Sequence, residues 1–280
     1  MKAQTKTADA SAEQSDTMFE VDGVSMTYET ARGSLNAISD VDLDIRRGEF
    51  LSLIGPSGCG KSTLLEIIGG MRRATAGEVR LEGERVSGPQ PDKISFVFQN
   101  YSLFPWRSVQ RNVEAGMEFQ GMSKSERRDR ARASLQLVGM DEFRDAFPAE
   151  CSGGMQQRVA IARALACEPD VLLMDEPFGA LDEQTRLVLG EELGRVLDTT
   201  DCTIVFVTHS LSEAVLLSDR VVVMQSRPGR IRRIYEVDAE RPRTGDFMAT
   251  KQFAELHREL FETLRDEIRA NDPAETMVPR

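Results

Sequence analysis

Residues 50–63 read Phe-Leu-Ser-Leu-Ile-Gly-Pro-Ser-Gly-Cys-Gly-Lys-Ser-Thr, and this stretch decides the fold. The apolar run at 50–54 predicts a buried strand, and residues 55–63 fit the phosphate-loop pattern G-x-x-x-x-G-K-[ST]. The apolar positions between Leu64 and Met71 predict a helix with one broad buried face. A strand, a glycine loop and a helix in this order predict an α/β fold with a phosphate site, rather than a flexible Gly/Ser turn.

The residue types of the loop suit the binding of phosphate. Glycines let consecutive backbone N–H groups curve around phosphate oxygens, and the following helix directs the positive end of its dipole at the same anion. Lys61 can reach the terminal phosphates, and Ser62 can offer its hydroxyl to Mg²⁺. We therefore predict that the nucleotide is held by Gly55, Pro56, Ser57, Gly58, Cys59, Gly60, Lys61, Ser62 and Thr63.

Length and charge limit the classes of function. A chain of 280 residues is long enough for one large domain or two lobes. Its net charge of −11 argues against a general nucleic-acid binder, although it leaves room for a local basic patch. No apolar run approaches the roughly 20 residues that cross a bilayer, and residues 1–17 lack the apolar segment of a signal peptide. We therefore expect a cytoplasmic protein with a disordered tail at 1–17 and free cysteine thiols.

A second strong signal is Val171-Leu172-Leu173-Met174-Asp175-Glu176-Pro177, an apolar run that ends in two acids. It predicts a buried strand with Asp175 and Glu176 at its carboxyl end, where ligands bind in open α/β sheets. Asp175 can hold Mg²⁺ through water, and Glu176 can polarise an attacking water. The alternative is a strand that ends in two solvated acids, and the phosphate loop makes that alternative the weaker one.

Three more residues carry weaker signals. Gln99 follows an apolar strand and can touch Mg²⁺ or water, but by itself an ordinary polar strand end explains it better. His209, one of only two histidines, follows the strand predicted at 203–208, and this placement favours a role at the γ-phosphate or at the attacking water. Tyr28 lies between two predicted strands, where position alone favours a half-buried tyrosine over a platform for adenine.

Residues 151–158 read Cys-Ser-Gly-Gly-Met-Gln-Gln-Arg and lead into a helical pattern. Ser152 can cap this helix, and the two glycines permit close approach of an anion, but a helix start without a ligand explains the motif equally well. Asp182 ends a tight turn and can cap the next helix. The aromatic loop at 101–106 is either an exposed patch for a partner or core beneath a loop, and the sequence favours neither.

Taken in order, these motifs resemble the nucleotide-binding subunits of ATP-binding-cassette (ABC) transporters from about Phe19 to Arg243. The resemblance implies a RecA-like P-loop NTPase core with an antiparallel β subdomain, inside an ATPase domain at 18–245. It implies a helical subdomain near residues 100–165. Beyond the domain, helical spacing of apolar residues predicts an amphipathic helix over 246–270, so that residues 246–280 form a C-terminal helix and tail. The resemblance further implies a head-to-tail homodimer in which each ATP lies between the phosphate loop of one subunit and the signature helix of the other.

The resemblance also implies roles for residues. Lys61, Gln99, Glu176 and His209 would act in catalysis, and Ser62, Gln99 and Asp175 would serve Mg²⁺. ATP contacts beyond the phosphate loop would come from Tyr28, Ser152, Gly153, Gly154, Gln156 and Asp182. The signature departs from the family at its first position, where Cys151 replaces the usual Leu. We expect a mild packing change, because cysteine behaves as a small hydrophobe.

Two stretches resemble a narrower branch of the family. Residues 97–106 fit V-F-Q-x-x-x-L-x-P-W, and residues 227–231 with 241–243 fit R-P-G-R-I…R-P-R. Both resemble importers of nitrate, taurine and aliphatic sulfonates, although some relatives carry pyrimidine precursors, bicarbonate or aromatic acids. This implies the ATPase of a bacterial importer, peripheral at the cytoplasmic face of the inner membrane. Its partners would be transmembrane permease subunits and, indirectly, a substrate-binding protein.

Other classes fit less well. A cassette ATPase that acts on DNA or ribosomes would carry an inserted coiled coil, a zinc module or a second cassette, and the sequence has none of these. A GTPase would need an N-K-x-D guanine motif, which is absent, and the Ser152-Gly153-Gly154 signature also argues against P-loop kinases. We therefore expect no nucleic-acid partner. Cys59 leads to one chemical expectation: its alkylation should block ATP binding, and ATP should protect it.

Overall fold

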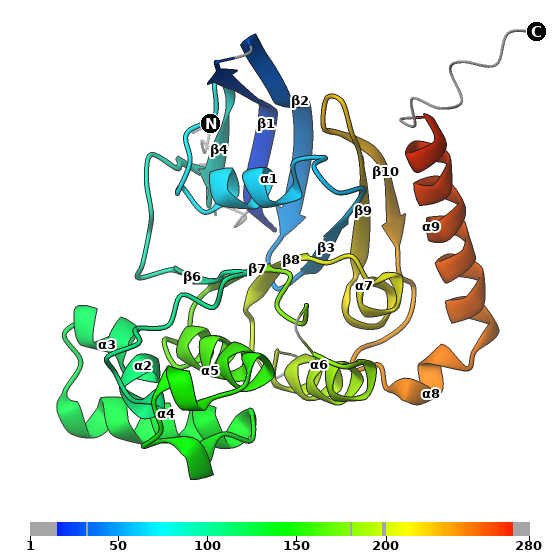
Figure 1. The fold of residues 1–280 in the computed structure, drawn as a ribbon. Coiled ribbons are helices and arrows are strands. Elements are labelled where there is room, and N and C mark those ends of the chain that lie inside the picture. Colours follow the sequence, from blue (N-terminus) through cyan, green and yellow to red (C-terminus); the bar gives the residue numbers. More distant parts are fainter. Residues whose placement is uncertain (1–15, 32, 180, 198–199, 271–280) are drawn as a thin grey trace, which may run out of the picture.

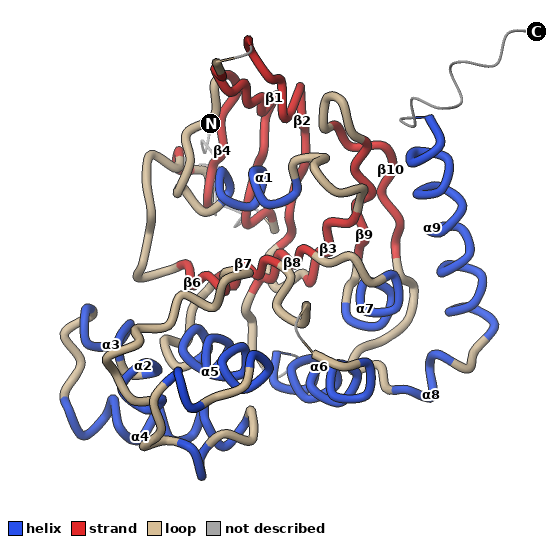
Figure 2. Tube along the Cα trace, in the orientation of Figure 1, coloured by secondary structure: helices blue, strands red, loops and turns tan. Residues whose placement is uncertain are grey.

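The computed structural model describes residues 16–31, 33–179, 181–197 and 200–270, which form two β-sheets with helices around them (Figures 1 and 2). Residues 1–15 of the predicted N-terminal tail lie outside this range. The end of that prediction is wrong, because Thr17 already pairs with Arg46 in the first strand.

The larger sheet positions the candidate site. Its strand order among the described residues is β10-β9-β3-β8-β7-β6, and all neighbours are parallel except β9 and β10. Because β3, β6, β7 and β8 are parallel, their carboxyl ends meet at one edge, and the phosphate loop, Gln99, Glu176 and His209 follow these ends. The strands are β3 (Phe50–Ile54), β6 (Ile94–Val97), β7 (Val171–Asp175), β8 (Thr203–Val207), β9 (Arg220–Gln225) and β10 (Arg230–Glu236).

Alternate residues of these buried strands face two different cores, as the two-residue period of a strand requires. Leu172 and Met174 of β7 pack with α5 (Gly153–Leu165) and α6 (Glu183–Leu197). Val171 and Leu173 pack with α1 (Lys61–Ile68) and the smaller sheet. Helix α1 therefore covers one face of the sheet and α5 with α6 covers the other (Figure 1). These observations confirm the predicted α/β core.

The smaller sheet is antiparallel, in the order β2-β1-β4-β5. Its strands are β1 (Thr17–Thr30), β2 (Gly33–Arg46), β4 (Ala76–Leu81) and β5 (Glu84–Arg85). The first two are longer than the strands that the apolar pattern predicts at 19–24 and 35–45, because pairing continues past several register shifts as far as the turn. Tyr28 therefore lies within β1, opposite Leu35, and not between two strands.

A group of helices lies below the larger sheet in Figure 1, in the region predicted as a helical subdomain. Together with α5 it comprises α2 (Val109–Val113), α3 (Ala115–Phe119), α4 (Lys124–Leu137) and the 3-10 turns Asp141–Phe143 and Pro148–Glu150. Ser123 caps α4, since its Oγ accepts a hydrogen bond from the backbone N–H of Glu126 at 3.4 Å. The outer limits of this subdomain stay a prediction.

The C-terminal part packs beside β9 and β10 through α7 (Leu211–Leu217), α8 (Gly245–Met248) and α9 (Lys251–Ala270). The single helix predicted over 246–270 is wrong, because the chain breaks at Ala249 and Thr250. The Thr250 side chain accepts a hydrogen bond from Phe253 N at 3.2 Å and so caps a new helix. None of the described helices combines the length and the apolarity needed to cross a bilayer.

Candidate nucleotide site

The phosphate loop requires glycine at two positions. A Cβ on Gly55 would lie 2.6 Å from the carbonyl oxygen of Met224. At Gly60, φ is 97°, and a Cβ would lie 2.9 Å from Cγ1 of Ile38. The loop is thus pressed against β9 and β2, which fixes its curvature. Buried Lys61 lies inside the curve and donates from Nζ to the Gly55 carbonyl at 2.9 Å.

The thiol of Cys59 lies beneath this cradle, with its sulfur 3.8 Å from Lys61 Nζ. Its side chain is buried in the apolar core beneath the loop, and burial raises the pKa of its thiol. The thiol is therefore neither accessible nor ionised at neutral pH. This contradicts the expectation that bound ATP would protect it, because protein atoms already cover it. Cys59 thus contributes its backbone, and not its thiol, to the lining of the loop.

Ser62 and Asp175 come together at the start of α1 and the end of β7. Ser62 Oγ donates to Asp175 Oδ1 at 3.0 Å. Burial raises the pKa of Asp175, the Ser62 hydrogen bond opposes this rise, and the neighbouring Glu176 carboxylate adds to it. A divalent cation at this carboxylate would favour its ionised form. The donor set therefore fits Mg²⁺, which takes one or two protein oxygens and completes its shell with phosphate and water.

The described residues contain no cluster of three or more His, Cys, Asp or Glu side chains that could hold a metal ion by themselves. A cation beside Ser62 and Asp175 would therefore depend on the phosphates for the rest of its ligands.

Glu176, His209 and Gln99 form one contact group. His209 Nε2 lies 2.6 Å from Glu176 Oε1, and Gln99 Nε2 donates to Glu176 Oε2 at 3.1 Å. Glu176 itself has a φ of 49°, an unusual left-handed conformation for a residue of this type. Its backbone N–H donates to Val207 and its carbonyl accepts from Gly179, and these two bonds hold the turn. The structure thus collects at one carboxylate the residues predicted from separate strand ends.

Tyr28 lies next to the phosphate loop, with its hydroxyl 3.2 Å from Oγ1 of Thr63. The guanidinium of Arg72 lies over the Tyr28 ring, 5.3 Å from its centre, and pairs with Glu66 at 2.6 Å. This position fits the predicted platform for adenine. The sequence analysis missed Arg72, and no pattern in the sequence distinguishes it from the neighbouring Arg73.

The signature residues build the start of α5. Ser152 caps this helix through a hydrogen bond from Met155 N at 3.3 Å, and both Ser152 and Gly153 are exposed. Gln156 does not point outward, because its side-chain amide donates to the carbonyls of Pro148 and Cys151 at 2.9 and 3.2 Å. Its role here is to hold the preceding loop.

Two further residues of this region are buried. Cys151 packs in the same apolar core as Leu181, which agrees with its expected behaviour as a small hydrophobe. Gln157, which the sequence analysis did not single out, donates to the Glu176 carbonyl at 3.3 Å. It links the signature helix to the acid of the contact group.

One chain does not bring the signature to its own phosphate loop. Helix α1 packs on one face of the larger sheet and α5 packs on the other (Figure 1). The predicted ATP contacts Ser152, Gly153 and Gly154 therefore lie away from Lys61 within a subunit.

Asp182 and His209 are linked through side chains that the sequence analysis missed. Asp182 caps α6 by accepting from Thr185 N at 3.0 Å, which lowers the pKa of Asp182. Arg186 then donates to the carbonyl of Leu181 at 2.9 Å and pairs with Glu213 at 3.3 Å.

Glu213 in turn accepts a hydrogen bond from the hydroxyl of Thr208, the residue before His209. The turn at Asp182 is therefore tied to the strand end that carries the histidine.

The aromatic loop at 101–106 is partly core and partly exposed surface, so both alternatives left open by the sequence apply to it. Tyr101 and Leu103 pack on the core, whereas Trp106 is 72% exposed. Buried Asn112 holds the loop, since its side chain accepts from Phe104 N at 2.7 Å and donates to the carbonyls of Phe104 and Arg107.

Comparisons with known proteins agree with this geometry. A family model described as "ABC transporter" matches residues 38–179. An uncharacterized ABC transporter ATP-binding protein of Methanocaldococcus jannaschii is 46% identical over 89% of this chain and 92% of its own length. A nitrate import ATP-binding protein of Synechocystis sp. is 48% identical over 77% of this chain and 80% of its own length.

Among solved structures, one similar to this chain is a dimeric ATP-binding cassette in a post-hydrolysis state, bound to ADP and Pi. It superposes with a TM-score of 0.74 at 35% identity and covers 80% of this chain and 100% of that one.

Proposed function

Because the chain belongs to the ABC transporter family and is an ATPase of that family, we propose that it energises the import of a small anion through a membrane permease of a bacterial cell. Nitrate, taurine and alkanesulfonates are the candidate substrates, and the nitrate-importing relative supports this choice. Pyrimidine precursors, bicarbonate and aromatic acids are the alternatives. No residue of this subunit contacts the transported molecule in such an arrangement, so the substrate must be found by experiment.

The observation that carries the proposal is the contact group around Glu176, beside the phosphate loop. Glu176 polarises the attacking water, and His209 and Gln99 hold its two carboxylate oxygens in place. Lys61 and the loop amides stabilise the negative charge that develops on the γ-phosphate. Mg²⁺, when bound at Ser62 and Asp175, neutralises phosphate charge.

Two copies of the chain are needed to complete the site. Ser152 and Gly153 are exposed at the start of α5, away from the phosphate loop of their own subunit. In a head-to-tail homodimer they would close over the ATP that the other subunit holds, and backbone N–H groups at a helix start suit a phosphate. The dimeric cassette bound to ADP and Pi supports this arrangement.

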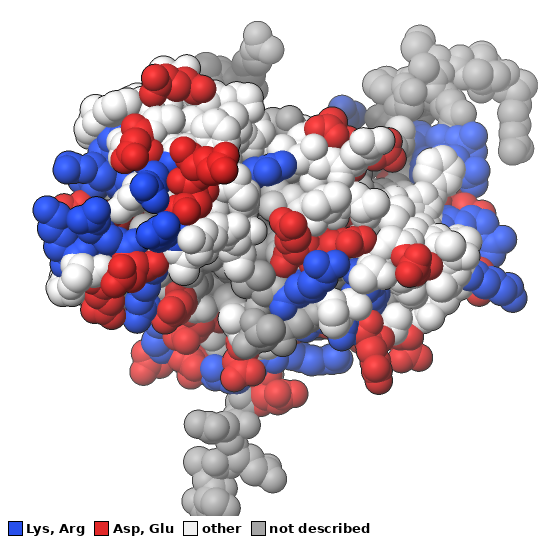
Figure 3. Space-filling view, turned by 90° about the horizontal axis from the view of Figure 1, so that it is seen from below, with Lys and Arg blue, Asp and Glu red and all other residues white. Residues whose placement is uncertain are grey.

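The permease would dock beside the loop Gln99–Trp106, on the cytoplasmic face of the membrane, and a substrate-binding protein would act through it. Exposed Trp106 borders an open cleft of about 700 Å³, which is also lined by Arg107, Arg111, Lys124 and Arg128. Basic and acidic side chains lie side by side over this group of helices in Figure 3, and Glu114, Glu118 and Asp145 also line the cleft. A short segment of the permease in this cleft would move with Gln99 and thereby sense the nucleotide.

The test is the Glu176→Gln variant of the full chain. We expect it to bind ATP, to dimerise on size-exclusion chromatography in ATP, and to hydrolyse ATP at least about 100-fold more slowly. Glu240→Gln, at an exposed carboxylate outside the site, is the matched control and should hydrolyse normally. Near-normal turnover in Glu176→Gln would remove Glu176 from its role.

Co-purification tests the transporter assignment. A membrane permease that copurifies with the chain supports import, and radiolabelled anions in vesicles then identify the substrate. A second candidate, a soluble ABC ATPase that acts on nucleic acid, would instead copurify with DNA or RNA.

A further inference from the structure

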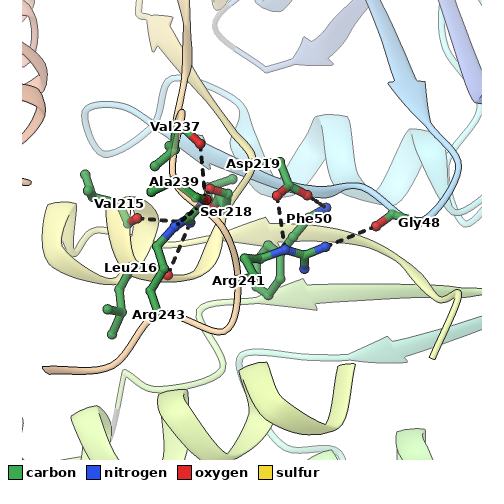
Figure 4. Close-up of polar contacts among 11 residues, drawn as sticks. Gly48, Phe50, Val215, Leu216, Ser218, Asp219, Val237, Ala239, Arg241 and Arg243 are labelled. Carbon is green, nitrogen blue, oxygen red and sulfur yellow. Dashed lines mark hydrogen bonds and ion pairs between the residues drawn. The ribbon is translucent and has the colours of Figure 1, made fainter. Parts of the chain in front are cut away.

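The segment Arg241-Pro242-Arg243 joins β10 to α8, and its two arginines reach back into the ATPase core (Figure 4). The motif resembles that of the importer branch, and neither arginine belongs to the contact group around Glu176. Arg243 is 5% exposed and Arg241 is half-buried. A buried guanidinium is costly unless its N–H groups are bonded, so the contacts of Arg243 indicate what it holds.

Arg243 binds the end of α7. Its Nη1 donates to the carbonyl of Ser218 at 2.8 Å and to those of Leu216 and Val215 at 3.3 and 3.4 Å. The last carbonyls of a helix have no partner within the helix, and a cation there also complements the helix dipole. The other side of the guanidinium donates to the carbonyls of Val237 and Ala239, in its own segment.

Arg243 therefore joins the segment before α8 to the carboxyl end of α7. The ring of Phe247 in α8 lies 5.7 Å from the guanidinium carbon and completes this packing.

The catalytic histidine lies just before the other end of α7. His209 immediately precedes Ser210, whose side chain caps α7 by accepting from Glu213 N at 3.3 Å. Helix α7 spans only Leu211–Leu217, which is about 10 Å at 1.5 Å per residue. Such a short helix moves as one body, so a displacement of its Arg243-bound end also displaces His209.

A second contact ties the same segment to the phosphate-loop strand. Arg241 pairs with Asp219 at 3.0 Å, and the other oxygen of Asp219 accepts from the backbone N–H of Phe50 at 2.9 Å. Phe50 begins β3, which leads into the phosphate loop. Arg241 thus fixes the segment to the rigid sheet, and Arg243 extends from it to α7.

We propose that Arg243 is a positioning residue for His209, so that the docking of segment 237–244 onto the carboxyl end of α7 sets the rate of ATP hydrolysis. This inference rests on the role of His209 in the proposed function. Loss of the Arg243 contacts leaves α7 without its partner at the carboxyl end, and His209 moves away from Glu176. ATP binding is preserved, because the phosphate loop keeps its own contacts.

The test is Arg243→Gln in the full chain, with ATP turnover measured against ATP concentration. We expect kcat to fall about tenfold or more, since small misplacements of catalytic groups are costly, with KM within about twofold of wild type. In the His209→Ala background, Arg243→Gln should lower kcat by less than about twofold, because residues that act through one another are not additive. A full tenfold loss in that background would overturn the proposal, as would an unchanged kcat in the single variant.

Imidazole NMR gives a readout that does not need turnover. The chain has only two histidines, and His257 stacks on Phe253 in α9. Arg243→Gln should shift the His209 ring signals. The control is Arg232→Gln, which breaks the 3.0 Å pair between β10 and Glu267 of α9 and does not touch α7. It should leave the His209 signals and kcat unchanged, and unmoved His209 signals in Arg243→Gln would contradict the proposal.

Two further variants cover the case in which Arg243→Gln does not fold and the case in which His209 has no role in catalysis. If Arg243→Gln fails to fold, Phe247→Leu removes the ring beside the guanidinium while it keeps the apolar volume, and it should lower kcat in the same direction. An unchanged kcat there overturns the proposal. The single variant His209→Ala tests the proposed function by itself: normal turnover would remove His209 from catalysis, whatever Arg243 does.

Discussion

His209 Nε2 lies 2.6 Å from Oε1 of Glu176, and this contact follows from the register of two parallel strands. Asp175 of β7 pairs with Val207 of β8, and the two side chains project just beyond this pair. The backbone N–H of Glu176 still donates to Val207, so the acid is fixed to the strand that carries the histidine. The register therefore brings the backbones of the two residues together, while the position of the imidazole also depends on α7, which begins two residues after His209.

Removal of the imidazole should slow hydrolysis without loss of the nucleotide. In His209→Ala we expect kcat to fall about 100-fold, because Glu176 and the γ-phosphate lose a positioned partner, while the Kd for ATP stays within about twofold. Calorimetric titration with ATP, combined with a turnover assay, checks both values. A variant that loses ATP binding would instead place His209 in ground-state recognition.

Tyr28 distinguishes stacking from hydrogen bonding. Tyr28→Ala should weaken ATP binding about tenfold, the size expected for one base on an aromatic ring. Tyr28→Phe loses only the 3.2 Å contact with Thr63 and should bind ATP nearly as tightly as wild type. Equal weakening in both variants, measured by fluorescence titration with a labelled ATP, would show that the hydroxyl and not the ring face matters.

Asp175 should limit the stability of the metal-free protein. Burial raises its pKa above the usual 3.8, so the folded state holds this proton to higher pH than the unfolded chain does. Stability is therefore lost as the pH rises from about 3.8 through the raised pKa.

Asp175→Asn carries no such loss, and its amide oxygen can still accept from Ser62. At pH 7 in EDTA we expect its Tm to be ~2 °C higher than that of wild type. The difference should shrink as the pH falls, and Mg–ATP should stabilise wild type more than the variant. Calorimetry at several pH values checks the sign, and a lower Tm for Asp175→Asn at pH 7 would contradict it.

Cys59 should resist alkylation in the folded protein. Its thiol is buried and its pKa is raised, so little thiolate is present or accessible. Burial also raises the pKa of Cys167, but this thiol is only partly buried, whereas the other three are buried, so it should react first with iodoacetamide. Labelling of Cys59 should be equally low with and without ATP. Peptide mass spectrometry quantifies both sites, and rapid ATP-sensitive labelling of Cys59 would mean that the loop opens.

The sequence predicts the parts of this site that depend on strand ends. Buried apolar runs that end in Glu176 and His209 need only the rule that parallel strands present their carboxyl ends at one edge. The glycines before Lys61 can also be predicted from the sequence, because the curvature of the phosphate loop requires their spacing.

The missed residues make contacts across long stretches of chain. Arg243 binds carbonyls at the end of α7, including that of the capping residue Ser218, 25 residues earlier, and Gln157 reaches the carbonyl of Glu176. Such bonds have no periodicity, and any arginine or glutamine could make them. The break before α9 was missed for a related reason, since Thr250 caps a helix in the middle of an uninterrupted amphipathic pattern.

The contacts of Arg243 also bear on how the protein opens in solution. Arg243, in the segment that leads to α8, donates hydrogen bonds to the carbonyls at the end of α7. Helix α7 and the C-terminal helices that follow this segment should therefore lose their protection against amide exchange together. In hydrogen–deuterium exchange we expect the amides of α7 and of α9 to exchange at matched rates, faster than those of β3 and β8. Arg243→Gln should then speed exchange in both helices. Exchange at His209 would thus report on a helix at the far end of the chain.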